Sequence, residues 1–130
     1  MIDLDNILND LKKSFPDIRI NSDISLPTVY ANFDATYRCF KLLIQTIKMF
    51  KQTSTITFTW KVVDGANELH ISNNAFSIFF DIPNALYDQE AATQYQTILE
   101  IKTLITLNKW DLELKEHPDF VFIIKNIKIK

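Results

Sequence analysis

Apolar residues recur at helical spacing in three stretches of the chain. Residues 1–15 form an N-terminal amphipathic segment in which Asp3 stands in the position of an N-cap and Pro16 ends the pattern, so a helix is predicted. A second helix is predicted from about Asp34 to Phe50, and a third over about 88–108. The apolar faces of the three helices are formed by Leu4, Ile7, Leu8, Leu11 and Phe15, by Phe33, Tyr37, Phe40, Ile44 and Ile47, and by Ala91, Tyr95, Ile98, Ile101, Leu104 and Ile105.

Strict alternation of apolar and polar residues marks the strands. In residues 54–63, Ile56, Phe58, Trp60 and Val62 alternate with threonines and a lysine, which predicts a strand with one buried face. Asp64-Gly65 is a hairpin signal, so 68–72 should be the partner strand, with Leu69 and Ile71 inward. Shorter extended pieces are predicted at 17–20 and 29–31. Two last strands are predicted in 109–116 and 119–130, around a turn at His117-Pro118.

This order of elements predicts an α+β fold. We expect a two-layer sandwich in which a mixed, mostly antiparallel sheet is covered on one face by helices. The 130 residues favour a single domain over 1–130, long enough to bury a core. The initial Met fits a whole protein and a trimmed piece equally.

Composition narrows the range of functions. The net charge of −2 and the lack of a long basic run disfavour nucleic acid as a partner, and no apolar run reaches the roughly 20 residues of a membrane span. The lone cysteine, Cys39, indicates a cytoplasmic setting and is expected to be buried. Gly65 is the single glycine, which disfavours loops that wrap phosphates.

Candidate catalytic chemistry is sparse. His70 and His117 are the only histidines, and neither has a second histidine or a cysteine at ligand spacing, so no metal site is predicted. His70 alternates with Leu69 and Ile71 and should face away from the core. No nucleophile elbow, Cys–His signature or phosphate loop is present, so catalytic residues are not assigned.

Three segments carry a family resemblance. They are FKLLIQTIKMF at 40–50, NNAFSI at 73–78 and YQTILEIKTLITLNKWDLEL at 95–114. With the element order over about 15–125, they resemble the ATP-binding domain of sensor histidine kinases, the GHKL class shared with gyrase, Hsp90 and MutL. The resemblance implies that class's Bergerat-like sandwich. It rests on spacing and apolar pattern rather than on motif identity.

The same resemblance implies a vestigial nucleotide site at Gln45, Lys48 and Asn73. Gln45 stands where the family has its magnesium-binding Asn, and Lys48 matches the family's lysine. Asn73 replaces the Asp that accepts a hydrogen bond from the adenine amino group. Other motif positions also differ from the family pattern: Lys41 at the first Asn of the helix, and Ala75, Ser77, Thr93, Tyr95, Thr97, Lys109 and Trp110 at glycines.

Since core positions keep their residue type while ligand positions change, we expect a signalling or protein-interaction domain that does not hydrolyse ATP and holds no cofactor. The resemblance suggests a response regulator or a kinase module as its protein partner. The alternative is a divergent domain of a two-component histidine kinase or histidine phosphotransferase that binds ATP and Mg²⁺ weakly through Gln45, Lys48 and Asn73.

Two apolar features leave alternatives open. Phe76, Phe79 and Phe80 lie in the apolar segment 75–82, which in the resembling family borders the nucleotide pocket. They either fill an empty pocket or form a docking surface for a partner protein. The apolar stripe of the first helix either packs on the domain's own sheet or pairs with a second copy in a homodimer.

Overall fold

The computed structural model describes residues 1–22, 24–50, 55–73, 96–115 and 121–129. The helices are α1 (Leu4–Ser14), α2 (Phe33–Phe50) and α5 (Gln96–Leu107). The strands are β1 (Ile2–Asp3), β2 (Arg19–Ser22), β3 (Thr28–Val29), β4 (Thr55–Val63), β5 (Ala66–Asn73), β6 (Asp111–Lys115) and β7 (Val121–Lys125). Every predicted element is therefore found within the described residues, although the predicted start of the third helix, 88–95, lies outside them.

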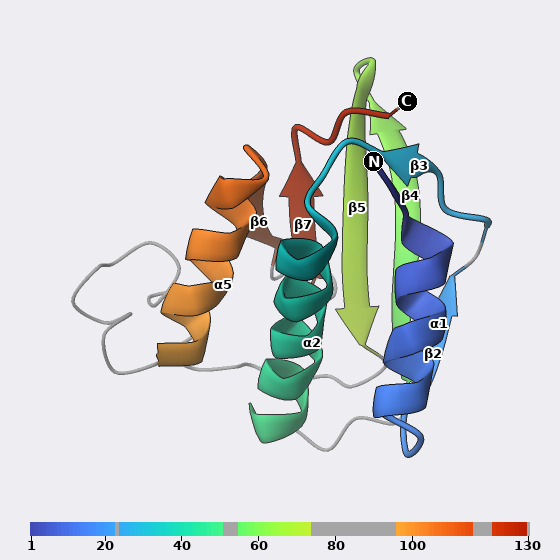
Figure 1. Cartoon of the computed structure of the whole chain (residues 1–130), viewed down its shortest axis with the longest axis vertical. Helices are drawn as coiled ribbons and strands as arrows, with labels where there is room; N and C mark the ends of the chain where they lie inside the picture. Colours follow the sequence, from blue (N-terminus) through green and yellow to red (C-terminus); the bar gives the residue numbers. More distant parts are fainter. Residues whose placement is uncertain (23, 51–54, 74–95, 116–120, 130) are drawn as a thin grey trace.

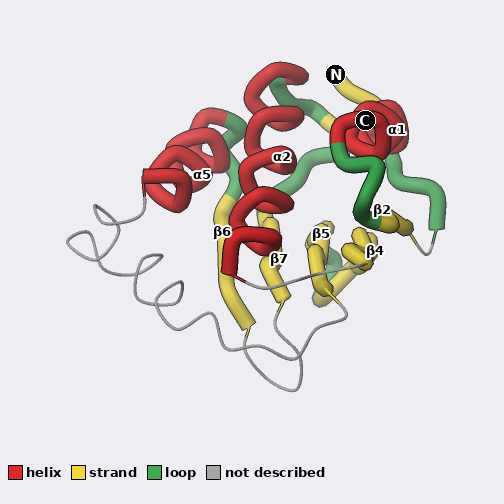
Figure 2. The backbone as a smooth tube through the Cα atoms, turned by 90° about the horizontal axis from the view of Figure 1, so that it is seen from below, coloured by secondary structure: helices red, strands yellow, loops and turns green. Residues whose placement is uncertain are grey.

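The main sheet has the strand order β2-β4-β5-β7-β6. Only the β2–β4 pair is parallel, and the other three pairs are antiparallel. Figures 1 and 2 show α1, α2 and α5 on one side of this sheet. A small sheet of β1 and β3 lies beside it and is joined to the C-terminal segment by a bridge between Val29 and Ile129. The predicted α+β sandwich is confirmed.

Local signals in the sequence explain two of the element ends. The Asp3 side chain accepts a hydrogen bond from the Asp5 N–H at 3.0 Å and so caps α1. Asp64 and Gly65 both have positive φ, 52° and 79°, as a two-residue hairpin turn between right-twisted strands requires. The resulting register pairs Val63 with Ala66 and extends to Ile56 opposite Asn73.

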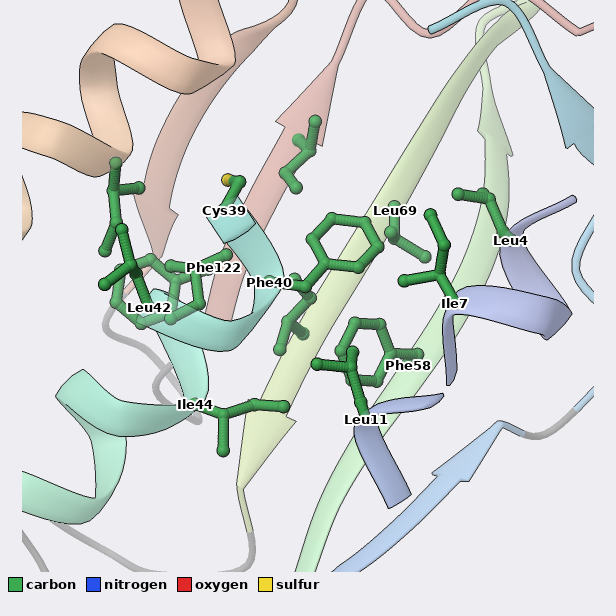
Figure 3. Close-up of a cluster of buried hydrophobic side chains, with 14 of the residues drawn as sticks. Leu4, Ile7, Leu11, Cys39, Phe40, Leu42, Ile44, Phe58, Leu69 and Phe122 are labelled. Atoms are coloured by element: carbon green, nitrogen blue, oxygen red, sulfur yellow. The ribbon is translucent and has the colours of Figure 1, made fainter. Parts of the chain in front are cut away.

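The core lies between the helices and the sheet (Figure 3). Phe40 of α2 and Phe58 of β4 are fully buried, with ring centroids 5.5 Å apart. The apolar stripe of α1 belongs to the same core, since Leu4, Ile7, Leu8, Leu11 and Phe15 are all buried. Of the two predicted roles of this stripe, packing within its own domain is the one found.

Two predicted core positions are wrong. Val62 is 64% exposed, because β4 continues past the buried part of the sheet towards the hairpin turn. Phe33 is 43% exposed at the first residue of α2, where its ring stacks parallel to that of Tyr37. Periodicity assigns a face to each of these residues but does not show where the covering layer ends.

The other face of the sheet carries polar and charged side chains. Glu68 and His70 alternate with the buried Leu69 and Ile71 and pair with each other at 2.9 Å on that face, as predicted for His70. Glu113 of β6 forms an ion pair with Lys125 of β7, which raises the pKa of Lys125. No helix in the described part of the chain is both long and apolar enough to cross a membrane.

Candidate functional site

The fold brings three of the predicted site positions to one end of the domain. Helices α2 and α5 contact each other and run antiparallel, so the first turn of α5, with Thr97, lies towards the C-terminal end of α2, with Gln45 (Figure 1). Strand β5 ends at Asn73 at the same end, the lower one in Figure 1. We call this region, defined by Gln45, Asn73 and Thr97, the lower end of the helix–sheet layer.

Among the α2 side chains that the structure describes, Gln45 is one of few that are exposed. Most of the helix is enclosed by the sheet and the neighbouring helices, whereas the Gln45 side chain is exposed and Lys41, one turn earlier, is half-buried. Lys48 belongs to the same helix, but its side chain lies outside the described residues. The sequence therefore places lysines four residues before and three residues after the amide that stands at the family's metal-ligand position.

Asn73 lies deeper than Gln45. It is half-buried, and its Nδ2 atom is buried. Alternation along β5 places it on the same face as Leu69 and Ile71, which is the face that the helices cover. An uncharged amide suits this position, because burying a carboxylate costs more than burying an amide.

The other end of the α2–α5 pair, which we call the upper end, is closed by hydrogen bonds that the sequence reasoning missed. The Asn32 side chain accepts from the Ala35 N–H at 2.8 Å and caps α2. Asn108 accepts from the Asn32 N–H at 3.0 Å and donates to the buried Thr36 hydroxyl at 2.9 Å. Asn32 is recognisable in the sequence as a cap before an apolar periodic stretch, whereas the contact of Asn108 with Thr36 has no local signal.

Between the two ends, an ion pair joins the helices. The Arg38 guanidinium donates to the Glu100 carboxylate, and this hydrogen bond raises the pKa of Arg38. Glu100 is the only acidic residue of α5. Its carboxylate is thus already engaged by a cation of α2.

Lys109 and Trp110, which replace a glycine pair of the resembling family, end helix α5. Lys109 has a positive φ of 60°. The Lys109 N–H donates to Thr106 O at 2.9 Å, and the Trp110 N–H donates to Ile105 O at 3.0 Å. These bonds form a Schellman motif, in which a glycine usually takes the left-handed position. Lys109, which stands where the family has a glycine, therefore takes part in ending helix α5 in this structure.

The remaining candidate residues provide no catalytic or metal-binding group at the lower end of the helix–sheet layer, as far as the structure describes them. Cys39 is fully buried, and burial raises the pKa of its thiol to about 12. Among the described residues, no group of three His, Cys, Asp or Glu side chains is placed to hold a metal ion. Several predicted positions lie outside the described residues: Phe76, Phe79, Phe80, Ala75, Ser77, Thr93, Tyr95 and His117.

Surface grooves in the described part of the chain lie away from these residues. One, of about 360 Å³, lies along α5 and is lined by Leu99, Lys102, Thr103, Thr106 and Leu107. The other, of about 440 Å³, lies between α1 and the residues Ser22, Ile24 and Ser25, and has a mostly polar lining that includes Asp5 and Lys12. The described residues lining them include neither Gln45 nor Asn73.

Comparison with solved structures shows a close likeness to histidine kinase ATP-binding domains. Histidine kinase AdeS of Acinetobacter baumannii aligns with a TM-score of 0.74 and 16% identity, over 99% of this chain and 66% of the AdeS chain. The ATP binding domain of PrrB from Mycobacterium tuberculosis gives 0.69 and 9%, over 99% and 96% of the two chains. The catalytic domain of histidine kinase ThkA gives 0.68 and 14%, over 95% and 92%.

No protein-family model and no curated protein matches the sequence. The likeness is therefore one of fold: this chain has the fold of histidine kinase ATP-binding domains, as the resemblance implied.

Proposed function

We propose that the chain is a non-catalytic signalling domain that uses the histidine kinase ATP-binding fold for contact with a protein rather than for ATP hydrolysis. The supporting observation is the chemistry around Gln45. The amide at the metal-ligand position is exposed on α2, and the half-buried Lys41 stands one turn earlier on the same helix. A bound Mg²⁺ ion is repelled by such a neighbour and gains only one neutral oxygen from Gln45.

The acidic residues of the two helices support the same proposal. Helix α2 has a single one, Asp34, in its first turn, far along the helix from Gln45. The single one of α5, Glu100, is engaged by Arg38. Mg²⁺ is usually held by one or two carboxylates together with substrate phosphates, and here neither helix offers a free carboxylate beside Gln45.

The residue at the adenine-binding position also supports a domain that does not hydrolyse ATP. In the resembling family an ionised Asp accepts a hydrogen bond from the adenine amino group, and hydrogen bonds to ionised groups are roughly twice as strong as neutral ones. Asn73 is neutral and half-buried, so its oxygen is a weaker acceptor.

A second function, weak nucleotide binding, is favoured by one observation. Gln45, Asn73 and the first turn of α5 lie at the same end of the domain, where a helix N-terminus favours anions. In this alternative, Gln45, Lys48 and Asn73 hold ATP in a divergent two-component kinase or phosphotransferase domain.

Calorimetric titration with ATP and Mg²⁺ distinguishes the two functions. Our proposal expects no binding tighter than about 100 µM, which corresponds to about 5 to 6 kcal/mol. The matched variant is Gln45→Asn/Asn73→Asp, which restores both family residue types at positions that the structure describes. A dissociation constant below about 100 µM for the unsubstituted protein, with binding lost in Gln45→Ala, contradicts the proposal and establishes the alternative.

The protein contact belongs to the proposal as well. Phe76, Phe79 and Phe80 lie outside the described residues, so a docking surface formed by them stays a prediction. A response regulator or a kinase module is the partner class that a domain of this fold would meet in two-component signalling, and a cytoplasmic location goes with that role. Losing contact with such a partner in Phe79→Ser/Phe80→Ser, while the fold is retained, is the result we expect.

A further inference from the structure

Strand β2 is the edge of the main sheet that lies beside α1 (Figure 1). It pairs in parallel with β4 on one side, and within the described ranges no strand pairs with it on the other. Since alternate residues of a strand direct their N–H and C=O groups to opposite sides, part of the β2 backbone faces away from β4. An edge of this kind can accept an extended segment as an additional strand.

The groove of about 440 Å³ described above starts at Ser22, the last residue of β2, and lies between this end of the strand and α1. Two hydrogen bonds hold the segment after β2 against α1. The Leu26 N–H donates to Asp5 Oδ1 at 3.0 Å, and the Leu4 N–H donates to Pro27 O at 3.4 Å. The groove is therefore formed by the chain itself, so binding loses little free energy in shaping it.

The lining of this groove has an apolar part and a cationic part. Ile24, which is 53% exposed, and the buried Leu8 supply the apolar side chains. Ile24 lies two residues beyond Ser22, so the apolar part is at the end of β2. Lys12 belongs to the last turn of α1, and only residues 15–18 join α1 to the start of β2. The cationic part is therefore near the start of the strand.

Two cations, Lys12 and Arg19, stand on the two faces of this edge. Lys12 is exposed on the side of the helices, whereas Arg19 is exposed on the other face of the sheet, since the neighbouring Ile20 is buried under the helices. Neither cation forms an ion pair with another described residue. Asp5, the acidic residue of the lining, lies in the first turn of α1 and already accepts the Leu26 N–H.

We propose that the edge of β2 binds an extended acidic segment of a partner protein, which joins the main sheet antiparallel to β2. Antiparallel pairing is slightly more stable than parallel pairing. A segment residue opposite Ser22 then points into the apolar part of the groove, because Ser22 itself is on the helix side, opposite the buried Phe58. The residue opposite Ile20 points to the side of Lys12, and the residue opposite Arg19 shares the face of that cation. The segment that fits has the order apolar, any, acidic, acidic.

A synthetic peptide with this order tests the proposal. The probe is acetyl-Thr-Val-Thr-Glu-Glu-Thr-amide, titrated into the isotope-labelled whole chain in about 0.1 M salt, where the Debye length of about 10 Å restricts attraction to nearby charges. We expect a dissociation constant of roughly 0.1–2 mM and the largest amide NMR shifts at Arg19–Ser22. The same peptide with lysines in place of the glutamates should bind at least about fivefold more weakly.

Three results of this titration overturn the proposal. They are no binding up to about 10 mM peptide, largest shifts outside β2 and the groove, and equal affinity for the two peptides. Shifts at Arg19–Ser22 that depend on protein concentration without any peptide would show that a second copy occupies the edge, and they overturn it as well.

Lys12→Glu, with Lys13→Glu as its matched control, tests the role of the groove. Both lysines are exposed in the last turn of α1, so the two substitutions change the net charge and the interaction with the helix dipole alike. Only Lys12 lines the groove. Lys12→Glu should weaken binding of the glutamate peptide at least about fivefold, and Lys13→Glu should stay within about twofold. Circular dichroism checks the fold of both variants, and equal losses overturn the proposal.

Alternate N-methylation of the peptide distinguishes strand addition from attraction of charge alone. In an added strand every second peptide residue directs its N–H to β2, so methylation of that set should abolish measurable binding. Methylation of the other set should leave the dissociation constant within about threefold. Equal effects of the two sets overturn the strand pairing. No measurement here involves a nucleotide or Phe76, Phe79 and Phe80, so the outcome is independent of the function proposed above.

Discussion

The two ends of the α2–α5 pair are built differently. At the upper end, Asn32, Thr36 and Asn108 bind one another, so the polar groups there satisfy each other within the chain. At the lower end, Gln45 is exposed and Thr97 is only partly covered. The hydrogen bonds at the upper end hold the two helices together, whereas Gln45 and Thr97 at the lower end keep exposed surface among the described residues. Stability and function should therefore respond to substitutions at opposite ends.

The largest effect is expected midway between the ends, in the shared core. Phe40→Ala removes a fully buried ring that packs on Phe58 and should lower the free energy of unfolding by about 3–5 kcal/mol. Urea denaturation measures this loss. A loss below about 1 kcal/mol would mean that α2 is not packed on the sheet as described.

The comparison itself is tested by substituting an amide at each end. Asn108→Ala removes the hydrogen bond to the buried Thr36 hydroxyl and should cost about 1–3 kcal/mol of unfolding free energy. Gln45→Ala, the matched change at the exposed end, should stay within about 0.5 kcal/mol. Equal losses in urea denaturation would show that the two ends do not differ in the way we describe.

An effect smaller than that of Asn108→Ala, and opposite in sign, is expected just beyond α5. Lys109 adopts a left-handed backbone conformation that is strained for lysine and that glycine adopts without strain. Lys109→Gly should raise the free energy of unfolding by about 0.5–1 kcal/mol, since strain relief outweighs the added entropy of the unfolded chain. Lys109→Ala keeps the strain and serves as the control. A decrease in thermal stability in the glycine variant would contradict the assignment of the Schellman motif.

Much of the fold was predictable because it follows from local sequence patterns, namely the spacing of apolar residues and the turn residues. The alternation of Ile56 and Phe58 with threonines fixes the face of β4, and Asp64-Gly65 fixes the hairpin register. The limits of the core were not predictable, as Val62 and Phe33 show, because they depend on how far a distant helix extends over the sheet. The contact between Thr36 and Asn108 was missed for the same reason, since 72 residues separate them.

The candidate site was predictable only as a location. The resemblance placed Gln45 and Asn73 in one region, and the fold brings them to the same end of the domain. The chemical state of that region depends on side chains from other elements. The engagement of Glu100 by Arg38 is an example, because neither residue stood out in the sequence.

The single glycine of the hairpin has a consequence for the denatured chain. Glycine gives an unfolded backbone more accessible conformations than any other residue, so a sequence that uses it once in 130 positions starts from a more restricted ensemble. Folding then removes less disorder per residue than in a chain of average composition. A smaller loss of conformational entropy on folding raises the stability of the folded state, which offsets exposed polar positions such as Gln45 that add little to that stability.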